Sequence, residues 1–248
     1  MENIRSFHDK GIYVIKKLYS SREIKLIKKN IDLIKKINPK KFSGIMKYYE
    51  KDFFRKKEIL IRAEYFYRKN KLLTKLIDGK KIKSILKKLT GDNCIIFKEK
   101  INYKPPGCRE DKLHQDMQGD WKKFSKTFVS VLISVDKSTK NNGCLEFDVS
   151  GNNHKTLRGK IFKKLKISQL KKPLFKKLFL NPGDVVFFNA YIPHKSGKNQ
   201  SNLRRSQIYL TYNKKKDGNF RGIYFDKKRI NYPPNNERDH GKNYVYKI

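Results

Sequence analysis

The pattern that most restricts the fold of this chain is a series of short β-rich runs separated by turns, beginning near residue 93. Two of the turns, Asn141-Asn142-Gly143 and Asn181-Pro182-Gly183-Asp184, consist of residues that tight turns favour. No helical pattern alternates with these runs, so the parallel sheet of an α/β protein is not expected. The expected core is an antiparallel sandwich or jelly roll. The runs cover residues 94–104, 127–136, 144–150, 185–190 and 205–213.

The first run contains the segment CIIFKEKINYK, which alternates between two faces, because successive side chains of a strand point to opposite sides. One predicted face carries Ile95, Phe97, Glu99, Ile101 and Tyr103, and the other carries Ile96, Lys98, Lys100 and Asn102. Lysines that face the inside of a barrel need an anion, which a co-substrate carboxylate or an anionic substrate would supply. The alternative is an edge strand whose lysines lie in solvent.

The N-terminal part of the chain indicates helices. After a short predicted strand, Ser20 and Glu23 fit a capping box, and isoleucines then recur at helical spacing. Helical patterns also extend from about Glu58 to Lys88, with a break near Asp78-Gly79. We therefore expect this part to form a helical layer against the β core.

The chain as a whole, residues 1–248, is expected to be a single domain. Its expected parts are a mainly helical N-terminal layer (1–92), a jelly-roll core (93–213) with a basic insertion (151–180), and a polar, loop-like C-terminal extension (214–248). Tyr232-Pro233-Pro234 and Tyr244-Val245-Tyr246 are expected to attach the extension to the core.

Cysteine use and hydropathy indicate a cytoplasmic protein. Cys94, Cys108 and Cys144 are an odd number without a CxxC motif, which favours free thiols in a reducing compartment. No apolar run reaches the roughly 18 residues of a membrane-spanning helix, and the N-terminus lacks the apolar centre of a signal peptide.

The formal net charge of +38 has two interpretations. It is typical of proteins that bind nucleic acid or another polyanion. However, lysine, asparagine and isoleucine are all abundant, as AT-rich codons would produce, and the lysines are spread along the chain rather than gathered in one stripe. Nucleic acid is therefore a possible but not the favoured partner, and the oligomeric state is not predicted.

The segment LHQDMQGDW contains a candidate for half of a metal site. His114 and Asp116 are two residues apart, so in an extended segment both side chains lie on the same side. Two imidazoles and one carboxylate bind iron(II) on one face and leave the other open in non-haem oxygenases. His194, just after the buried run, is the candidate third ligand. The alternatives are a chance pairing and an ordinary half-buried histidine.

An arginine lies eleven residues after His194, at position 205. A guanidinium that points into the barrel would bind the far carboxylate of a dicarboxylic acid in bidentate fashion. Arg204 is the neighbouring alternative, although on a strand it would point the other way. Gln207 and Tyr209 are expected to share the inward side with Arg205.

These segments together resemble the phytanoyl-CoA dioxygenase family of iron(II)/2-oxoglutarate oxygenases. The resemblance rests on HQD, on GDVVFFNAYIPHKSGKNQSNLRRSQIYLTYN, and on FHDKGIYVIKKLYSSREI, FKEKINYKPPG and NNGCLEF, with the 151–180 insertion least similar. It implies a double-stranded β-helix, or cupin-like jelly roll. It also implies iron(II) as cofactor, with 2-oxoglutarate and O2 as co-substrates, succinate and CO2 as products, and hydroxylation of an unactivated C–H bond.

Carried over to this sequence, the resemblance implies that His114, Asp116 and His194 bind iron. It implies that Arg205 and Ser196 bind the distal end of 2-oxoglutarate, where Lys100 and Asn102 are further candidates. Related halogenases lack the carboxylate at the position of Asp116, so its presence favours hydroxylation. His154 resembles a histidine that follows a turn in the family and is not expected to bind metal.

The substrate is expected to be a small anionic or zwitterionic metabolite: a phosphonate such as 2-aminoethylphosphonate, a compatible solute or an acyl derivative. Candidate substrate contacts are Lys98, Tyr209 and Trp121. Trp121 is the only tryptophan, and a core position is the favoured alternative for it. Two alternatives remain at this point. One is an inactive jelly-roll protein that binds nucleic acid, and the other is an oxygenase that acts on a modified macromolecule.

Overall fold

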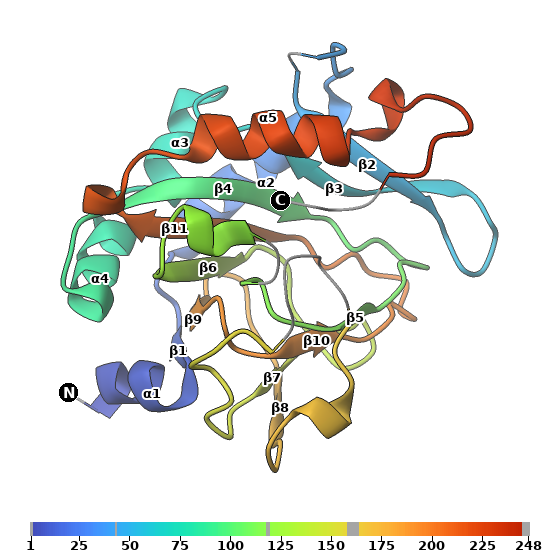
Figure 1. The fold of residues 1–248 in the computed structure, drawn as a ribbon. Coiled ribbons are helices and arrows are strands. Elements are labelled where there is room, and N and C mark those ends of the chain that lie inside the picture. Colours follow the sequence, from blue (N-terminus) through green and yellow to red (C-terminus); the bar gives the residue numbers. More distant parts are fainter. Residues whose placement is uncertain (1, 43, 118–119, 158–163, 245–248) are drawn as a thin grey trace.

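The computed structural model describes residues 2–42, 44–117, 120–157 and 164–244, and contains two sheets with antiparallel pairing throughout. One has seven strands in the order β1-β9-β6-β11-β4-β3-β2, and the other has four in the order β5-β10-β7-β8 (Figure 1). The expected mainly β, jelly-roll class is confirmed. The strands are β1 (Ile12–Ile15), β2 (Met46–Lys51), β3 (Glu58–Glu64), β4 (Cys94–Asn102), β5 (Asp111–His114), β6 (Phe128–Ser134), β7 (Leu145–Asp148), β8 (Phe175–Leu178), β9 (Val185–Asn189), β10 (His194–Ser196) and β11 (Gln207–Lys214).

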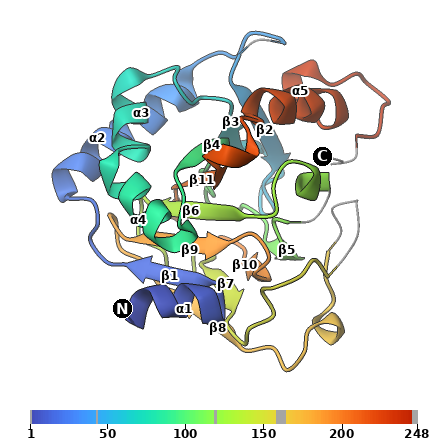
Figure 2. The same cartoon turned by 60° about the vertical axis from the view of Figure 1, so that its left-hand side comes forward.

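Helices α2, α3 and α4 lie together on one side of the larger sheet (Figure 2). Helix α2 begins with the expected capping box, in which Ser20 Oγ accepts from the backbone N–H of Glu23. Its isoleucines pack in one cluster with residues of α3, α4 and the larger sheet, so this helical layer is anchored by apolar burial. The helices are α1 (Glu2–Lys10), α2 (Ser21–Lys36), α3 (Lys71–Ile77), α4 (Lys80–Thr90) and α5 (Arg221–Asn231).

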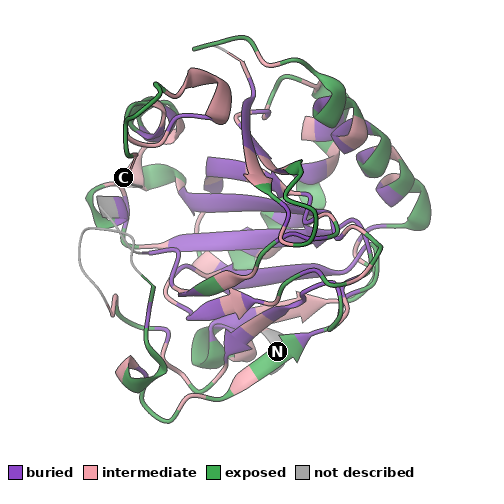
Figure 3. Ribbon diagram, turned by 90° about the vertical axis from the view of Figure 1, so that its right-hand side faces the viewer, coloured by how far each residue is buried: buried purple, intermediate pink, exposed green. Residues whose placement is uncertain are grey.

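Strand alternation separates two buried layers. In β6, Val131 and Ile133 join the cluster under the helices, whereas Leu132 joins a second cluster between the two sheets. In β9, Phe187 and Phe188 divide in the same way. The central strands are therefore buried on both faces (Figure 3), and the space between the sheets is where a site can form.

One expectation for the N-terminal layer was wrong. Residues 58–64 form strand β3 rather than a helix, and β3 pairs with β4 and β2, extending the larger sheet. The strand forms because ILIRAE offers alternate side chains to the sheet and finds a partner in β4, which helical periodicity alone does not reveal. As a result, β4 is an inner strand, and its lysines are not on an exposed sheet edge.

The expected alternation of β4 holds only from Lys98 onward. The register with β11 shifts between Thr211 and Tyr212, so that Phe97 is an extra residue without a partner. Ile96 therefore packs under the helices, and Phe97 packs in an aromatic cluster on the side of Lys98. The predicted placement of Ile96 and Phe97 was wrong for this reason.

The parts after residue 150 also differ from expectation. Within the expected insertion at 151–180, β8 pairs with β7 and completes the smaller sheet, while residues 158–163 lie outside the described part. The C-terminal extension is not only loop, since it contains α5, which packs against β4. Tyr48 Oη donates to the carbonyl of Tyr232, as an attached extension requires, whereas the expected contacts of Val245 and Tyr246 fall outside the described residues.

No described helix is both long and apolar enough to cross a membrane. Cys94, Cys108 and Cys144 are all buried and free.

Candidate metal centre

Two strands of the smaller sheet bring the expected metal ligands together. His114 ends β5, His194 begins β10, and the two residues are paired across the strands, with their ring centroids 4.2 Å apart. Asp116 follows β5 by two residues. One ligand atom from each of the three side chains lies within 4.8 Å of the others, which is close enough for one ion to bind all three.

Hydrogen bonds orient both imidazoles for metal binding. Nδ1 of His114 lies 2.6 Å from the carbonyl of Lys112, and Nδ1 of His194 lies 3.0 Å from the carbonyl of Ile192. A carbonyl only accepts, so each Nδ1 carries the proton and each Nε2 keeps its lone pair for a metal. Two neutral nitrogens and a carboxylate match the donor set of a non-haem iron site.

The surroundings hold these ligands in their metal-binding protonation states. Burial, followed by the neighbouring His194, lowers the pKa of His114 to about 3, and burial also lowers the pKa of His194. Burial alone would raise the pKa of Asp116, but Lys98 and Lys100 outweigh it and lower that pKa overall. Ser130 Oγ donates to Asp116 Oδ2 at 3.2 Å and so fixes the carboxylate.

A cavity of about 320 Å³ opens beside the three side chains. Its described lining contains eight cationic side chains against three carboxylates, so it favours anionic occupants. The cationic residues are Arg62, Lys98, Lys100, Lys104, Arg109, Lys112, Lys164 and Lys228, and the acidic ones are Glu64, Asp111 and Asp116.

A sequence model of the phytanoyl-CoA dioxygenase (PhyH) family matches residues 7–206. The chain belongs to the phytanoyl-CoA dioxygenase family. It is a non-haem iron(II) dioxygenase that uses 2-oxoglutarate and O2, in agreement with the donor set and with the expectation from the sequence.

Curated relatives agree with this assignment, and a solved structure shares the fold. The chain is 36% identical over 203 residues to a 2-aminoethylphosphonate dioxygenase from the uncultured bacterium HF130_AEPn_1, covering 80% of this chain and 76% of that protein. It is 33% identical to a methylphosphonate hydroxylase from Gimesia maris, covering 69% and 65% of the two chains. EctD from S. alaskensis, solved with 2-oxoglutarate and 5-hydroxyectoine, superposes with a TM-score of 0.71 at 17% identity, over 87% of this chain and 76% of that one.

The residues expected to bind 2-oxoglutarate lie at one end of the dioxygenase cavity. Lys100 and Asn102 line it, whereas Arg205 and Ser196 lie just behind its described lining. Arg205 is only 1% exposed, and its guanidinium donates to Gln207, which also accepts from Tyr209 Oη at 2.8 Å. The expected inward direction of Arg205, Gln207 and Tyr209 is therefore confirmed, although Arg205 precedes β11 rather than opening it.

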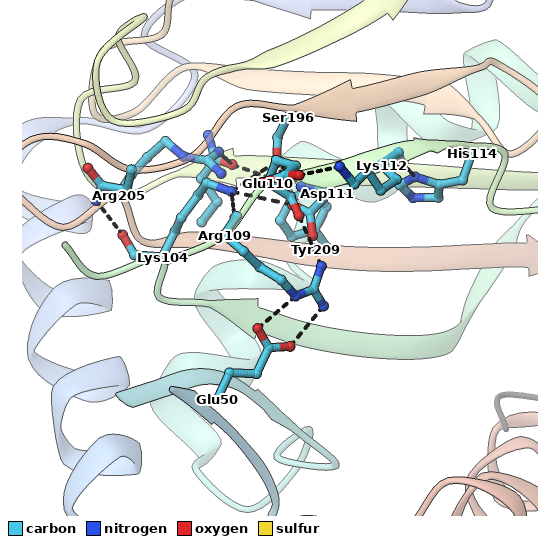
Figure 4. Close-up of polar contacts among 12 residues, drawn as sticks. Glu50, Lys104, Arg109, Glu110, Asp111, Lys112, His114, Ser196, Arg205 and Tyr209 are labelled. Carbon is cyan, nitrogen blue, oxygen red and sulfur yellow. Dashed lines mark hydrogen bonds and ion pairs between the residues drawn. The ribbon is translucent and has the colours of Figure 1, made fainter. Parts of the chain in front are cut away.

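Sequence analysis missed two residues at this end of the dioxygenase site, Lys104 and Asp111. Ser196 Oγ donates to Asp111 Oδ2 at 2.6 Å and accepts from Lys104 Nζ at 3.0 Å. The cluster lies between Arg205 and His114 in the close-up (Figure 4). Lys104 follows the alternation of β4, but a charged residue after a strand end gave no reason to expect burial.

The candidate substrate contacts divide between the two ends of the cavity. Lys98 and Trp121 line one end together, with Lys98 Nζ 4.0 Å from the Trp121 ring centroid. Trp121 also packs in the aromatic cluster with Phe97, so it serves both core and cavity. Tyr209 lines the cavity but lies against Lys100, whose Nζ is 4.7 Å from its ring, on the side of Arg205.

Two further elements of the dioxygenase complete the wall near Lys98. Glu64 and Arg62 come from β3, and Lys228 comes from α5, and all three line the cavity. Lys228 donates to Glu64, while Arg62 Nε lies 3.2 Å from the same carboxylate. Sequence reasoning did not find them because neither β3 nor α5 was expected as such.

Proposed function

We propose that this dioxygenase hydroxylates a C–H bond of a small organophosphonate, and that residues 1–248 act as one oxygenase domain. The observation that carries the proposal is the His114, Asp116 and His194 cluster beside a strongly cationic cavity. The two phosphonate-oxidising relatives support the choice of phosphonate over other anions. The three buried free cysteines support a cytoplasmic location, where thiols stay reduced.

In this proposal, His114, Asp116 and His194 bind iron(II). When bound, the iron supplies the oxidising chemistry with 2-oxoglutarate and O2, yielding succinate and CO2. His114, Asp116 and His194 would hold the metal ion, and the cavity beside them would position the co-substrate and the substrate next to it. Ser130 holds the Asp116 carboxylate, and the two backbone carbonyls hold the imidazoles.

Arg205, Ser196, Lys100 and Asn102 are proposed to bind 2-oxoglutarate. The distal carboxylate would take the guanidinium hydrogens that Gln207 now accepts and the Ser196 hydroxyl that Asp111 now accepts. Lys104 adds a third donor at the same end, with its Nζ 3.6 Å from Asp111. A charge-assisted, bidentate contact favours the arginine over any single lysine.

The cavity size favours a small substrate. Ligand pockets typically measure roughly 300–1,000 Å³, and this cavity of about 320 Å³ has to hold both 2-oxoglutarate and the substrate. A short phosphonate suits a cavity of this size, whereas most of an acyl-CoA would have to lie outside it.

The test is an anaerobic titration with iron(II) and 2-oxoglutarate, followed by assays of succinate release. We expect the visible metal-to-ligand charge-transfer band of the family, and succinate release stimulated by methylphosphonate or 2-aminoethylphosphonate. His194→Ala should abolish the band, whereas His154→Ala, an exposed histidine away from the cavity lining, should retain it. A band that persists in His194→Ala would contradict the metal site. A normal band with no response to any phosphonate would contradict the substrate.

A further inference from the structure

Lys98 is the most unusual charged group in the cavity. It is only 8% exposed, it lines the cavity, and across the described residues its ammonium makes no hydrogen bond or ion pair. Its ammonium lies over the face of Trp121, 4.0 Å from the ring centroid. Its strand, β4, lies between β11 and β3, so this burial is built into the sheet. Such a lysine is costly without an anion.

The wall around Lys98 carries an excess of positive charge. Lys100 comes from the same strand, and it likewise makes no recorded hydrogen bond or ion pair within the described chain. Lys228 and Arg62 add two more cations, and both contact the carboxylate of Glu64. The metal ligand Asp116 is the other carboxylate that acts on Lys98.

With Lys100 assigned to 2-oxoglutarate, three cations remain around Lys98, beside the carboxylates of Glu64 and Asp116. The charge of Asp116 would be shared with the bound metal ion, so the three cations exceed the remaining carboxylate by two. This excess suits a head group that carries two negative charges better than one that carries a single charge.

The strand registers place Lys98 away from the proposed co-substrate end. Lys98 is opposite Thr211, which pairs with Ser130, and Ser130 donates to Asp116. Asn102, at the other end of the lysine row, is opposite Gln207, the partner of Arg205. An anion on Lys98 would therefore lie beside the metal site, at the end opposite Arg205.

We propose that Lys98, supported by Lys228, binds the phosphonate group of the substrate over the face of Trp121, and that this subsite selects a dianionic tetrahedral head group over a carboxylate. This inference rests on the proposed phosphonate hydroxylase function. It adds which residues recognise the head group and at which end of the cavity the head group lies. An ammonium has three donors, so Lys98 can contact more than one phosphonate oxygen.

The experiment measures binding to protein loaded with iron(II) and 2-oxoglutarate without oxygen, so that no turnover occurs. The readout is the fluorescence of Trp121, the only tryptophan in the chain, during titration with ethylphosphonate, ethyl phosphate or propionate. Ethylphosphonate is expected to bind at least about tenfold more tightly than propionate, and the phosphate ester shows whether the subsite distinguishes phosphonate from phosphate. Lys98→Met is expected to weaken ethylphosphonate binding by roughly 10- to 100-fold, the loss of one or two charge-assisted hydrogen bonds.

Two variants serve as controls. Lys177→Met removes the same charge from an exposed position on β8 and should leave phosphonate binding unchanged. Lys98→Arg keeps the charge and should bind phosphonate more tightly than Lys98→Met. In each variant, the charge-transfer band shows that the protein is folded and loaded. If Lys98→Met lacks the band, two other comparisons decide the outcome. One is the ethylphosphonate affinity of Lys98→Arg against that of wild type, and the other is the ratio of the wild-type affinities for ethylphosphonate and propionate.

The inference is overturned if wild type releases succinate with a phosphonate but Lys98→Met binds that phosphonate as tightly as wild type does. It is also overturned if propionate binds as tightly as ethylphosphonate. By contrast, a wild-type protein that neither binds nor turns over any phosphonate contradicts the proposed function itself. The two failures are therefore distinguishable.

Discussion

Arg204 and Arg205 are adjacent in sequence but have opposite surroundings. Arg204 turns toward the helical layer, where its Nη1 lies 2.5 Å from Asp32 and its Nε lies 3.2 Å from Asp136. Arg205 turns toward the space between the sheets and reaches Gln207. The two arginines therefore differ as expected: Arg204 forms structural ion pairs, and Arg205 lies next to the site.

Arg205→Ala is predicted to raise the KM for 2-oxoglutarate far more than it weakens iron binding. Losing a bidentate, charge-assisted pair in a buried site costs roughly 2–5 kcal/mol, which corresponds to about 30- to 4,000-fold in affinity. Arg205→Lys should recover part of the loss, since an ammonium lacks the planar fork. Arg204→Ala should leave this KM almost unchanged and lower stability by up to about 1 kcal/mol. Steady-state kinetics with varied 2-oxoglutarate checks this, and a large effect of Arg204→Ala alone would contradict it.

Lys98→Met is predicted to stabilise the ligand-free, metal-free protein while it impairs phosphonate binding. Burial, the largest effect, lowers the pKa of Lys98 from 10.5 to about 7. Below about pH 7 the Lys98 amine is protonated in both the folded and the unfolded chain, so the folded state bears the full cost of burying the charge. Between about 7 and 10.5 only the unfolded chain holds the proton, so raising the pH favours the folded state and reduces the penalty.

The increase in the free energy of unfolding from Lys98→Met should therefore be greatest below about pH 7 and should shrink as the pH approaches 10.5. At about 1.4 kcal/mol per pKa unit, it reaches up to roughly 5 kcal/mol. Urea unfolding at a series of pH values measures it. A variant that is less stable than wild type throughout this range would show that Lys98 has a stabilising partner.

At the level of elements, α5 is attached to the sheet by a buried ion pair. Arg221 Nε and Nη2 lie 2.9 and 2.6 Å from the two oxygens of Glu99, a fully buried residue of β4. The same helix carries Lys228 and Tyr224 to the cavity end of the molecule. The position of one wall of the proposed substrate site therefore depends on this contact.

Arg221→Ala is predicted to destabilise the protein by about 3–5 kcal/mol, because it leaves the Glu99 carboxylate buried without its cation. It should also raise the KM for phosphonate, since Lys228 loses its fixed position, while the charge-transfer band persists. Urea unfolding and limited proteolysis across residues 221–231 are the measurements. Asp226→Ala, an exposed change in the same helix, is the control and should behave as wild type. Equal proteolysis of the two variants would contradict the proposed attachment.

At the level of the whole molecule, the charge of +38 is distributed widely, and eight of the 61 lysines and arginines line the described cavity. Many others form ion pairs over the surface, such as Lys28 with Asp136 and Lys16 with Asp184. Attraction to polyanions by the surface charge and recognition of a small anion in the cavity would therefore depend on different residues.

Binding to generic duplex DNA is predicted to be weak and to fall steeply as salt increases, because it would come from counterion release alone. Saturating DNA at about 0.15 M salt, where the Debye length is about 8 Å, should not change phosphonate-stimulated succinate release. Fluorescence anisotropy of labelled DNA and the succinate assay measure the two effects. DNA that competes with phosphonate for the cavity would instead favour a macromolecular substrate.

The sequence by itself determined the reaction class and the ligand set. His114 and Asp116 are separated by the period of a strand, and His194 and Arg205 stand at a spacing that the family resemblance could match. The β-rich runs after residue 93 and the capping box at Ser20 could also be predicted from short segments, because alternation and capping depend on neighbouring residues only. These features can therefore be predicted without knowledge of the tertiary contacts.

Only the tertiary structure decided which residues line the cavity together. Glu64 and Lys228 are 164 residues apart and meet because β3 pairs with β4 while α5 packs across it. The bulge at Phe97 and the Ser196–Asp111–Lys104 cluster likewise depend on which strands pair and in which register. Pairing partners are set by the sum of many long-range contacts, whereas periodicity reports only which face a residue occupies. A strand pattern thus shows that Lys98 lies on one face of β4, and the packed structure shows that this face is the wall of a cavity.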